Sequence, residues 1–371
     1  MKRNIALILA IVLVTLALVG CGQKTDDAPT ELRPVTFVFP RTLEVLEDTP
    51  FWAAKVLGYF EEEGLDVNFE QAFGTTDLRM VATGQAEFAC PGPSFTLAAI
   101  EEGVPVKVVM AYDAINIWGM CVLTNGPIQS FDDMIDAQAK YGRRLTVALG
   151  DASWEMLVVP TLIAAGINPD EDLEFVVAGE GRFIQVAEGN IDMLFSWPGE
   201  AWQLMGQNFD FIYIDGNDVL QTVSNSIITN LDLIENEPEV VAGFVRALAK
   251  GMYFTQYNFE AAAAVSTNQF PAIDITWNAA VGVQEGRAYQ MFGPKGGQLE
   301  AQMLDNIGWN WENKWDLVMD SAVESEIISA PIPLDRVFTN EFIDSTWDRA
   351  AVRADADNFD IESARSRYAL D

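Results

Sequence analysis

The chain has 371 residues, with 22 Lys and Arg against 55 Asp and Glu, no histidine and three cysteines, so its formal net charge is −33. The acid excess argues against a nucleic-acid-binding protein, because phosphate backbones are bound through Lys and Arg. The absence of histidine excludes His-based triads, bases and metal ligands, and three cysteines cannot build a disulfide framework. We expect about two domains from the length, and neither a metal nor a cofactor.

The N-terminus predicts an exported, lipid-anchored protein. Lys2 and Arg3 precede an uncharged, mostly apolar run over 5–19 that is too short to span a membrane. The Leu-Val-Gly segment before Cys21 resembles a bacterial lipobox, which implies a signal peptide over 1–20 and a lipidated, palmitate-bearing Cys21. The polar residues 21–34 then form a tether. An uncleaved anchor is the alternative, and both interpretations place the remainder outside the cytoplasmic membrane.

A first α/β set occupies residues 35–124, which we assign to the first part of lobe 1. Period-two alternation and short apolar runs indicate strands, and Pro50 suits a first helical turn. The predicted strands are 35–39, 65–70, 87–90, 104–111 and 118–124, and the predicted helices are 50–60, 76–83 and 94–102. This alternation predicts an α/β architecture with largely parallel sheets.

A second α/β set occupies residues 125–222, assigned to lobe 2. Its predicted strands are 144–149, 173–178, 191–195 and 209–214, and a helix is predicted over 154–165. Residues 223–349 are a mostly helical return to lobe 1, and 350–371 are a charged C-terminal tail. Two α/β units and a helical return predict two lobes with a ligand cleft between them, at strand ends and helix N-termini.

Cys90 and Cys121 both lie in apolar, strand-like runs. Buried free thiols are therefore favoured over a disulfide between them.

Several motifs, in order and with consistent spacing, resemble the type II periplasmic-binding-protein superfamily. They are PFWAAKVLGYFEEEGLDV at 50–67, TGQAEFA at 83–89, GVPV at 103–106, AAGINP at 164–169 and AEGNIDML at 187–194. The branch they resemble most contains ABC-transporter receptors for taurine, aliphatic sulfonates, nitrate, riboflavin and thiamine pyrimidine precursors. The resemblance implies a solute receptor that closes by a hinge and docks on a permease with its ATPase subunits, and we expect it to be a monomer.

The same resemblance implies that the chain is not an enzyme. A fungal single-turnover pyrimidine synthase is similar to this branch, but it uses a histidine and a cysteine-rich motif that this sequence lacks. A carboxylate-based extracellular enzyme, such as a glycosidase, stays as a remote alternative because acids are abundant.

Loops after the predicted strands supply the candidate ligand-binding residues. Each has a plainer alternative: an arginine can be a solvated surface group, an aromatic ring can be core, and a serine can be a helix cap. The candidates are Arg41, Thr42, Trp52, Ser94, Trp118, Ser153, Trp154, Arg182, Trp197 and Glu200. Aromatic rings are frequent among them, which favours a flat heteroaromatic ligand.

The segment SWPGEAWQL at 196–204 resembles the YWNWExxQL segment of thiamine-pyrimidine receptors. Trp197 and Glu200 match its first Trp and its Glu, which implies contact with an amino-heterocycle, whereas Gly199 replaces its second Trp. A carboxylate can accept N–H bonds from such a ring. We expect a thiamine pyrimidine precursor or riboflavin as ligand. A small anion (sulfonate, taurine or nitrate) is the alternative, for which Arg41 and Ser153 would dominate binding.

Overall fold

The computed structural model describes residues 31–43 and 45–369. The chain divides into two units, Met1–Leu32 and Arg33–Asp371, and the architecture below is that of the second. The predicted signal peptide and Cys21 lie outside the described residues. Among the residues that are described, no helix is long and apolar enough to cross a membrane.

The first sheet has the strand order β2-β1-β3-β10-β4. Its strands are β1 (Arg33–Phe39), β2 (Leu65–Gln71), β3 (Phe88–Ala89), β4 (Val106–Ala111) and β10 (Ser226–Asn230). β1 pairs in parallel with β2 and β3, whereas β10 runs antiparallel between β3 and β4. The sequence analysis missed β10, which returns the chain from lobe 2 to lobe 1.

The second sheet has the order β7-β6-β8-β5-β9. Its strands are β5 (Gly119–Leu123), β6 (Leu145–Leu149), β7 (Leu173–Val177), β8 (Met193–Ser196) and β9 (Phe211–Ile214). β5 pairs antiparallel with β8 and β9. The chain therefore enters lobe 2 before Gly119, earlier than the boundary expected at 124, and both sheets are mixed rather than largely parallel.

Helices cover both faces of the first sheet. One face is covered by α2 (Thr49–Val56), α3 (Tyr59–Glu62) and α12 (Pro238–Tyr257). The other face is covered by α4 (Thr76–Ala82) and α5 (Pro93–Glu101). Successive side chains of β1 point to opposite faces of the sheet. Phe37 packs against Phe244 of α12, and Val38 packs in the core on the other face. The helix expected over 50–60 is divided at Gly58, whose φ of +78° ends α2.

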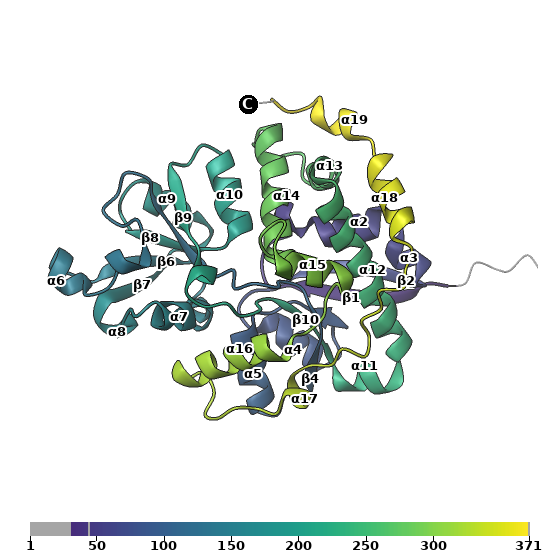
Figure 1. Cartoon of the computed structure of the whole chain (residues 1–371), viewed down its shortest axis with the longest axis horizontal. Coiled ribbons are helices and arrows are strands. Elements are labelled where there is room, and N and C mark those ends of the chain that lie inside the picture. Colours follow the sequence, from purple (N-terminus) through teal and green to yellow (C-terminus); the bar gives the residue numbers. More distant parts are fainter. Residues whose placement is uncertain (1–30, 44, 370–371) are drawn as a thin grey trace, which may run out of the picture. The chain divides into compact units, whose positions relative to one another are not determined.

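Lobe 2 repeats this layering (Figure 1). Its helices are α6 (Ala137–Tyr141), α7 (Glu155–Ala164), α8 (Pro169–Asp172), α9 (Arg182–Ala187) and α10 (Pro198–Gly206). Val147 of β6 and Leu162 of α7 lie in one core, and Ala148 of β6 and Ala201 of α10 lie in the other. Cys121 is free and buried in the second of these cores, and Cys90 is free and buried in lobe 1, as predicted.

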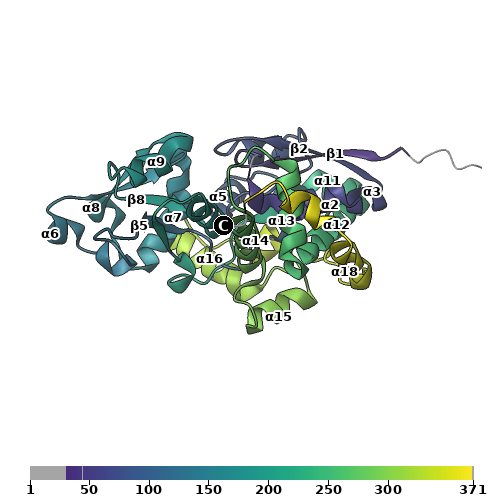
Figure 2. The same cartoon turned by 90° about the horizontal axis from the view of Figure 1, so that it is seen from above.

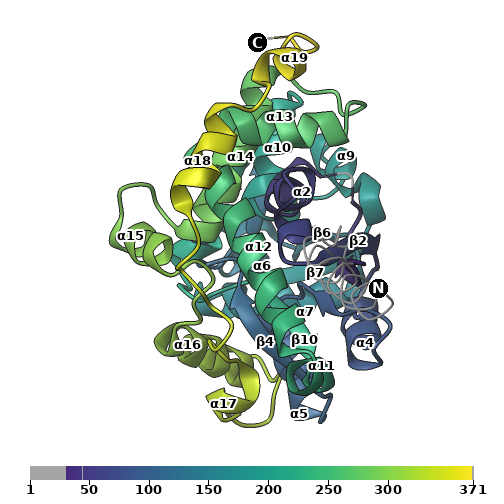
Figure 3. The same cartoon turned by 90° about the vertical axis from the view of Figure 1, so that its right-hand side faces the viewer.

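The remaining helices belong to lobe 1. They are α11 (Leu231–Asn236), α13 (Phe259–Gln269), α14 (Trp277–Phe292), α15 (Gln298–Asp305), α16 (Glu312–Glu324), α17 (Leu334–Val337), α18 (Arg349–Asp357) and α19 (Ile361–Arg365). The yellow helix α18 runs beside α12 (Figure 3) and buries Val352 and Ala356. The charged C-terminal segment is thus packed against the lobe through the apolar face of α18.

Two crossing segments, 112–118 and 215–225, join the lobes. They are hydrogen-bonded to each other, because the N–H groups of Tyr112 and Asp113 donate to the Asn225 carbonyl at 3.1 and 2.9 Å. The lobes also meet where α10 packs on α14 (Figure 1), and Figure 2 shows α14 on the lobe 2 side of α12. There a Cβ on Gly286 would lie 1.9 Å from the Trp202 ring, so the glycine allows this close approach.

Candidate functional site

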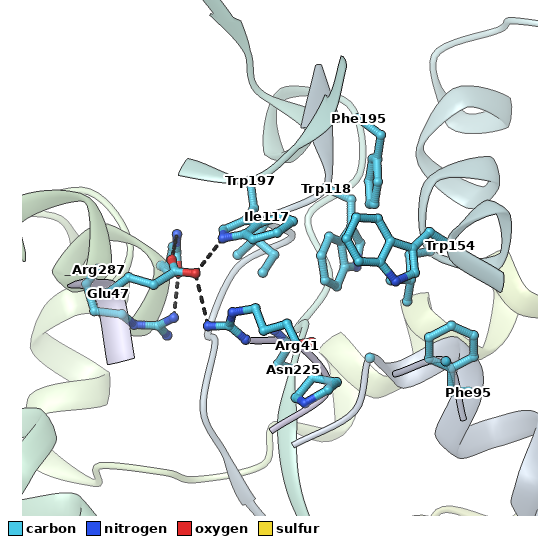
Figure 4. Close-up of a pocket in the computed structure, with 15 residues that line it drawn as sticks. Arg41, Glu47, Phe95, Ile117, Trp118, Trp154, Phe195, Trp197, Asn225 and Arg287 are labelled. Atoms are coloured by element: carbon cyan, nitrogen blue, oxygen red, sulfur yellow. Dashed lines mark hydrogen bonds and ion pairs between the residues drawn. The ribbon is translucent and has the colours of Figure 1, made fainter. Parts of the chain in front are cut away.

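A cavity lies between the two lobes, at the ends of strands from both sheets (Figure 4). It holds about 530 Å³ of empty space, counting space open to solvent. Its wall consists of Pro40, Arg41, Glu47, Gly74, Gly92, Phe95, Ile117, Trp118, Trp154, Leu157, Phe195, Trp197, Asn225, Arg287 and Gln290. The cleft expected at strand ends and helix N-termini is therefore present, and the crossing segments contribute to it.

Aromatic rings form the lobe 2 side of this cavity. The centroid of Trp154 lies 6.0 Å from that of Trp197 and 5.9 Å from that of Phe195, both edge to face. Trp118 lies 5.6 Å from Phe195. Trp118 immediately precedes β5, Trp154 follows β6, and Phe195 and Trp197 lie at the end of β8. Because β5 runs antiparallel to β8, these positions meet at one edge of the sheet. Such a wall suits a flat ring, which can stack on it or meet it edge to face.

Arg41, at the end of β1, is held by two carboxylates. Its Nη2 lies 3.0 Å from Glu47 Oε1 and 2.7 Å from Asp48 Oδ1. Burial opposes ionisation of the guanidinium, but the Asp48 and Glu47 charges outweigh it and raise the pKa of Arg41. Burial also raises the pKa of Asp48 to about 7, against the opposing effect of Arg41. The Arg41 charge is therefore neutralised within the wall.

A second arginine, Arg287 of α14, is neutralised in the same way. Its guanidinium pairs with the buried Asp113 carboxylate on the crossing segment and lies 4.1 Å above the Tyr112 ring. Arg287 Nη1 donates to Gln290 Oε1 at 2.5 Å, and Gln290 Nε2 donates to Glu47 Oε2 at 3.3 Å. Burial raises the pKa of Asp113, and the arginine opposes this rise.

Glu47 of lobe 1 makes a direct hydrogen bond to lobe 2 at this cavity. The Trp197 indole Nε1 of lobe 2 donates to Glu47 Oε1 of lobe 1 at 2.5 Å. Gly199 lies against the same carboxylate, because a Cβ built on it would be 1.7 Å from Glu47 Oε2. The glycine that replaces the motif's second Trp therefore makes room for an acid from the opposite lobe, which no motif indicated.

Arg182 and Glu200 form a pair beside the cavity rather than in its wall. The Arg182 guanidinium binds the Glu200 carboxylate, which also accepts from Ser196 Oγ at 2.8 Å. Arg182 Cζ lies 5.0 Å from the Trp154 ring and 5.9 Å from the Trp197 ring, within cation–π range. Burial raises the pKa of Glu200, while Arg182 and the serine oppose the rise.

The structure brings most of the candidate residues together. Arg41, Trp118, Trp154 and Trp197 line the aromatic cavity. Thr42, Arg182, Trp197 and Glu200 line a second cavity next to it.

Three candidates are absent from both walls. Trp52 packs into the lobe 1 core, with its ring centroid 4.9 Å from Phe69. Ser153 acts locally, because its N–H and hydroxyl both donate to Asp151 Oδ1. Ser94 is buried in the first turn of α5 between two residues that do line the cavity. Trp52 therefore fills the core, whereas Ser153 is not a helix cap, because Asp151 caps the turn that contains it.

Several wall residues were not among the sequence candidates, including Glu47, Phe195, Asn225, Arg287 and Gln290. Asn225 is 8% exposed, and its side-chain amide has no hydrogen-bond partner among the described residues. Arg287 and Gln290 lie on one buried face of a long apolar helix. Buried polar residues at that helical spacing were the signal that could have identified both.

Two curated relatives match nearly the whole chain. One is the riboflavin-binding protein RibY of Chloroflexus aurantiacus, 25% identical over 90% of this chain and 96% of the relative. The other is a formylaminopyrimidine-binding protein of Halalkalibacterium halodurans, 24% identical over 83% of this chain and 94% of the relative. Both relatives are named as binding proteins.

Solved structures share the periplasmic-binding-protein fold at lower identity. The aliphatic sulphonate binding protein SsuA of Escherichia coli has a TM-score of 0.59 and 13% identity, covering 83% of this chain and 92% of that one. The desulfurization enzyme DSZB has a TM-score of 0.51 and 14% identity, covering 84% and 97%. At these identities the likeness shows the fold alone.

The chain also matches the model of a protein family. The model of one family, described as NMT1/THI5 like, matches residues 46–262, which hold most of both sheets and most of the cavity wall. The chain therefore belongs to the NMT1/THI5-like family.

Proposed function

We propose that the chain is the extracytoplasmic solute receptor of an ABC importer and that it captures a flat heteroaromatic vitamin or vitamin precursor. The observation that carries this proposal is the wall of Trp118, Trp154 and Trp197 in a cavity between two lobes. A ligand held between the lobes favours the closed arrangement, which the permease then recognises. Riboflavin and formylaminopyrimidine, named for the two relatives, are the ligands of this class to test.

The polar groups of the cavity suit the edge of such a ring. The amide of Asn225 offers one donor group and one acceptor, and Glu47 adds a carboxylate. The Asn225 amide lines the cavity without a hydrogen-bond partner among the described residues, so the edge of a pyrimidine or flavin ring could bind both its donor and its acceptor. Stacking would supply affinity and these groups would supply orientation.

A receptor for a small anion is the second candidate, favoured by the two arginines in the wall. Arg41 and Arg287 are, however, each paired with buried carboxylates. Because these pairs already balance the arginine charges, a sulfonate or nitrate would add an unbalanced negative charge beside Glu47, Asp48 and Asp113, which is unfavourable in a buried site. The charge arrangement thus supports a neutral ligand, and the names of the two curated relatives, both binding proteins, support a receptor over an enzyme.

We propose further that the mature chain is anchored in the cell membrane through lipidated Cys21. The support is the lipobox-like sequence before this residue. Mass spectrometry of the membrane-extracted protein should find an acylated N-terminal cysteine. A Cys21→Ser variant should lose the acyl mass, and an unmodified native N-terminus would contradict the anchor.

A thermal-shift panel tests the ligand class. The panel contains riboflavin, thiamine, aminopyrimidines, taurine, an alkyl sulfonate and nitrate. Binding raises the melting temperature because it stabilises the folded state by RT ln(1+[L]/Kd). We expect shifts with the heteroaromatic compounds alone, and shifts confined to taurine, sulfonate or nitrate would contradict the proposal.

A further inference from the structure

A second cavity lies next to the aromatic one and shares two of its wall residues, Glu47 and Trp197. We propose that this second cavity, here termed the tail chamber, binds a polyhydroxylated chain carried by the ring in the aromatic cavity. The inference rests on the proposed function and narrows it, because it selects a flavin with a polyol chain over a short-chain pyrimidine.

The tail chamber has a different lining from the aromatic cavity. Its empty space is about 720 Å³, again counting space open to solvent. It is lined by Thr42, Val45, Glu47, Arg182, Phe183, Trp197, Gly199, Glu200, Gln203, Leu204 and Gln207. Whereas five aromatic side chains line the first cavity, only Phe183 and Trp197 are aromatic among the lining residues here, and they lie beside hydroxyl, amide and charged groups.

One face of α10 supplies much of this polar wall. Glu200, Gln203 and Gln207 follow one another at spacings of three and four residues, so they lie on the same side of the helix and its last turn. The side-chain amides of Gln203 and Gln207 have no hydrogen-bond partners among the described residues. Each amide offers both a donor and an acceptor, as a chain of alcohol groups does.

The charged side chains that line the tail chamber each form an ion pair with a side chain of opposite charge. Glu200 binds Arg182, and Glu47 binds Arg41. A charged chain would compete with these pairs, whereas alcohol groups can hydrogen-bond beside them without displacing either partner. The chamber therefore favours a neutral polar chain over a phosphate or a carboxylate.

The two chambers meet at a contact that depends on lobe closure. Glu47 belongs to lobe 1 and Trp197 to lobe 2, both line each of the two cavities, and a 2.5 Å hydrogen bond joins them. Opening the lobes separates this pair, which lets a ligand enter with its ring on one side and its chain on the other. Closure then holds the junction of ring and chain.

The test compares riboflavin with lumiflavin, which carries a methyl group in place of the polyol chain. Dissociation constants are measured from flavin fluorescence for the native protein and for Gln203→Leu. The matched control is Gln302→Leu, which changes an exposed glutamine on α15, outside both chambers.

We expect the native protein and Gln302→Leu to bind riboflavin at least tenfold more tightly than lumiflavin. Gln203→Leu should weaken riboflavin about fivefold or more and leave lumiflavin unchanged. Two results overturn the proposal that the tail chamber binds the polyol chain, without affecting the proposed ring site. One is equal affinity of the native protein for both flavins, and the other is an equal loss of affinity for both flavins in Gln203→Leu. Failure of both flavins to bind the native protein also overturns flavin as the ring ligand.

Discussion

Replacing Gly199 by Ala should block closure of the lobes without harming the fold of either lobe. The added Cβ would lie 1.7 Å from Glu47 Oε2 and 2.6 Å from Glu47 Cδ, so the carboxylate must move whenever the lobes close. Moving it breaks the 2.5 Å bond from Trp197. A hydrogen bond to a charged group contributes about 1.5–3 kcal/mol.

Loss of this hydrogen bond destabilises the closed state, which is the state that encloses the ligand. The Kd for riboflavin should therefore rise about 10- to 150-fold, since about 1.4 kcal/mol corresponds to a factor of ten. Titration calorimetry measures the affinity, and small-angle scattering with saturating ligand reports whether closure occurs.

Gly282→Ala provides the matched control. Gly282 is also helical, and a Cβ there would have no heavy atom within 4 Å. Alanine favours a helix over glycine by up to about 1 kcal/mol, so this variant should be as stable as the native protein or more so, with unchanged affinity. An unchanged Kd in Gly199→Ala would refute the role assigned to the Glu47–Trp197 contact.

Three further changes test the cavity wall and the charged groups around it. Trp154→Leu removes a stacking surface and should weaken riboflavin about tenfold in a fluorescence titration, an effect expected of one aromatic contact; unchanged affinity would contradict stacking. Glu200→Gln removes the charge that pairs with the buried Arg182 and should lower the free energy of unfolding in urea by about 2 kcal/mol, whereas no change would show that the pair does not stabilise the fold. Asp48 has a pKa raised to about 7 in the fold, so it binds protons more strongly when folded than when unfolded. The free energy of unfolding of the native protein relative to Asp48→Asn should thus fall as pH rises from 4 to 7, and a constant difference would contradict burial of this carboxyl.

The sequence predicts the architecture because its signals are local. Hydrophobic alternation, Pro50 and the glycines at helix ends indicate most strands and helices. β10 was missed because Ser226–Asn230 is a short run whose pairing, antiparallel between β3 and β4, joins residues more than 100 positions apart. The assignment of β5 to lobe 1 failed for the same reason, since its partners β8 and β9 come later in the chain.

The same difference between local signals and long-range contacts explains which site residues could be predicted. Trp118, Trp154 and Trp197 could be identified because each lies beside a predicted strand end. Glu47 could not be identified, because its importance comes from its contact across the lobes with Trp197. Trp52 was overestimated for the opposite reason, since a tryptophan near a strand end can also fill a core.

The most direct test of the proposed receptor is titration calorimetry of the purified protein with riboflavin, formylaminopyrimidine, taurine and ethanesulfonate. The aromatic wall and the paired arginines predict binding of at least one heteroaromatic compound at micromolar Kd or tighter and no measurable heat with either sulfonate. Binding of a sulfonate with no heat from either heteroaromatic compound would contradict the account.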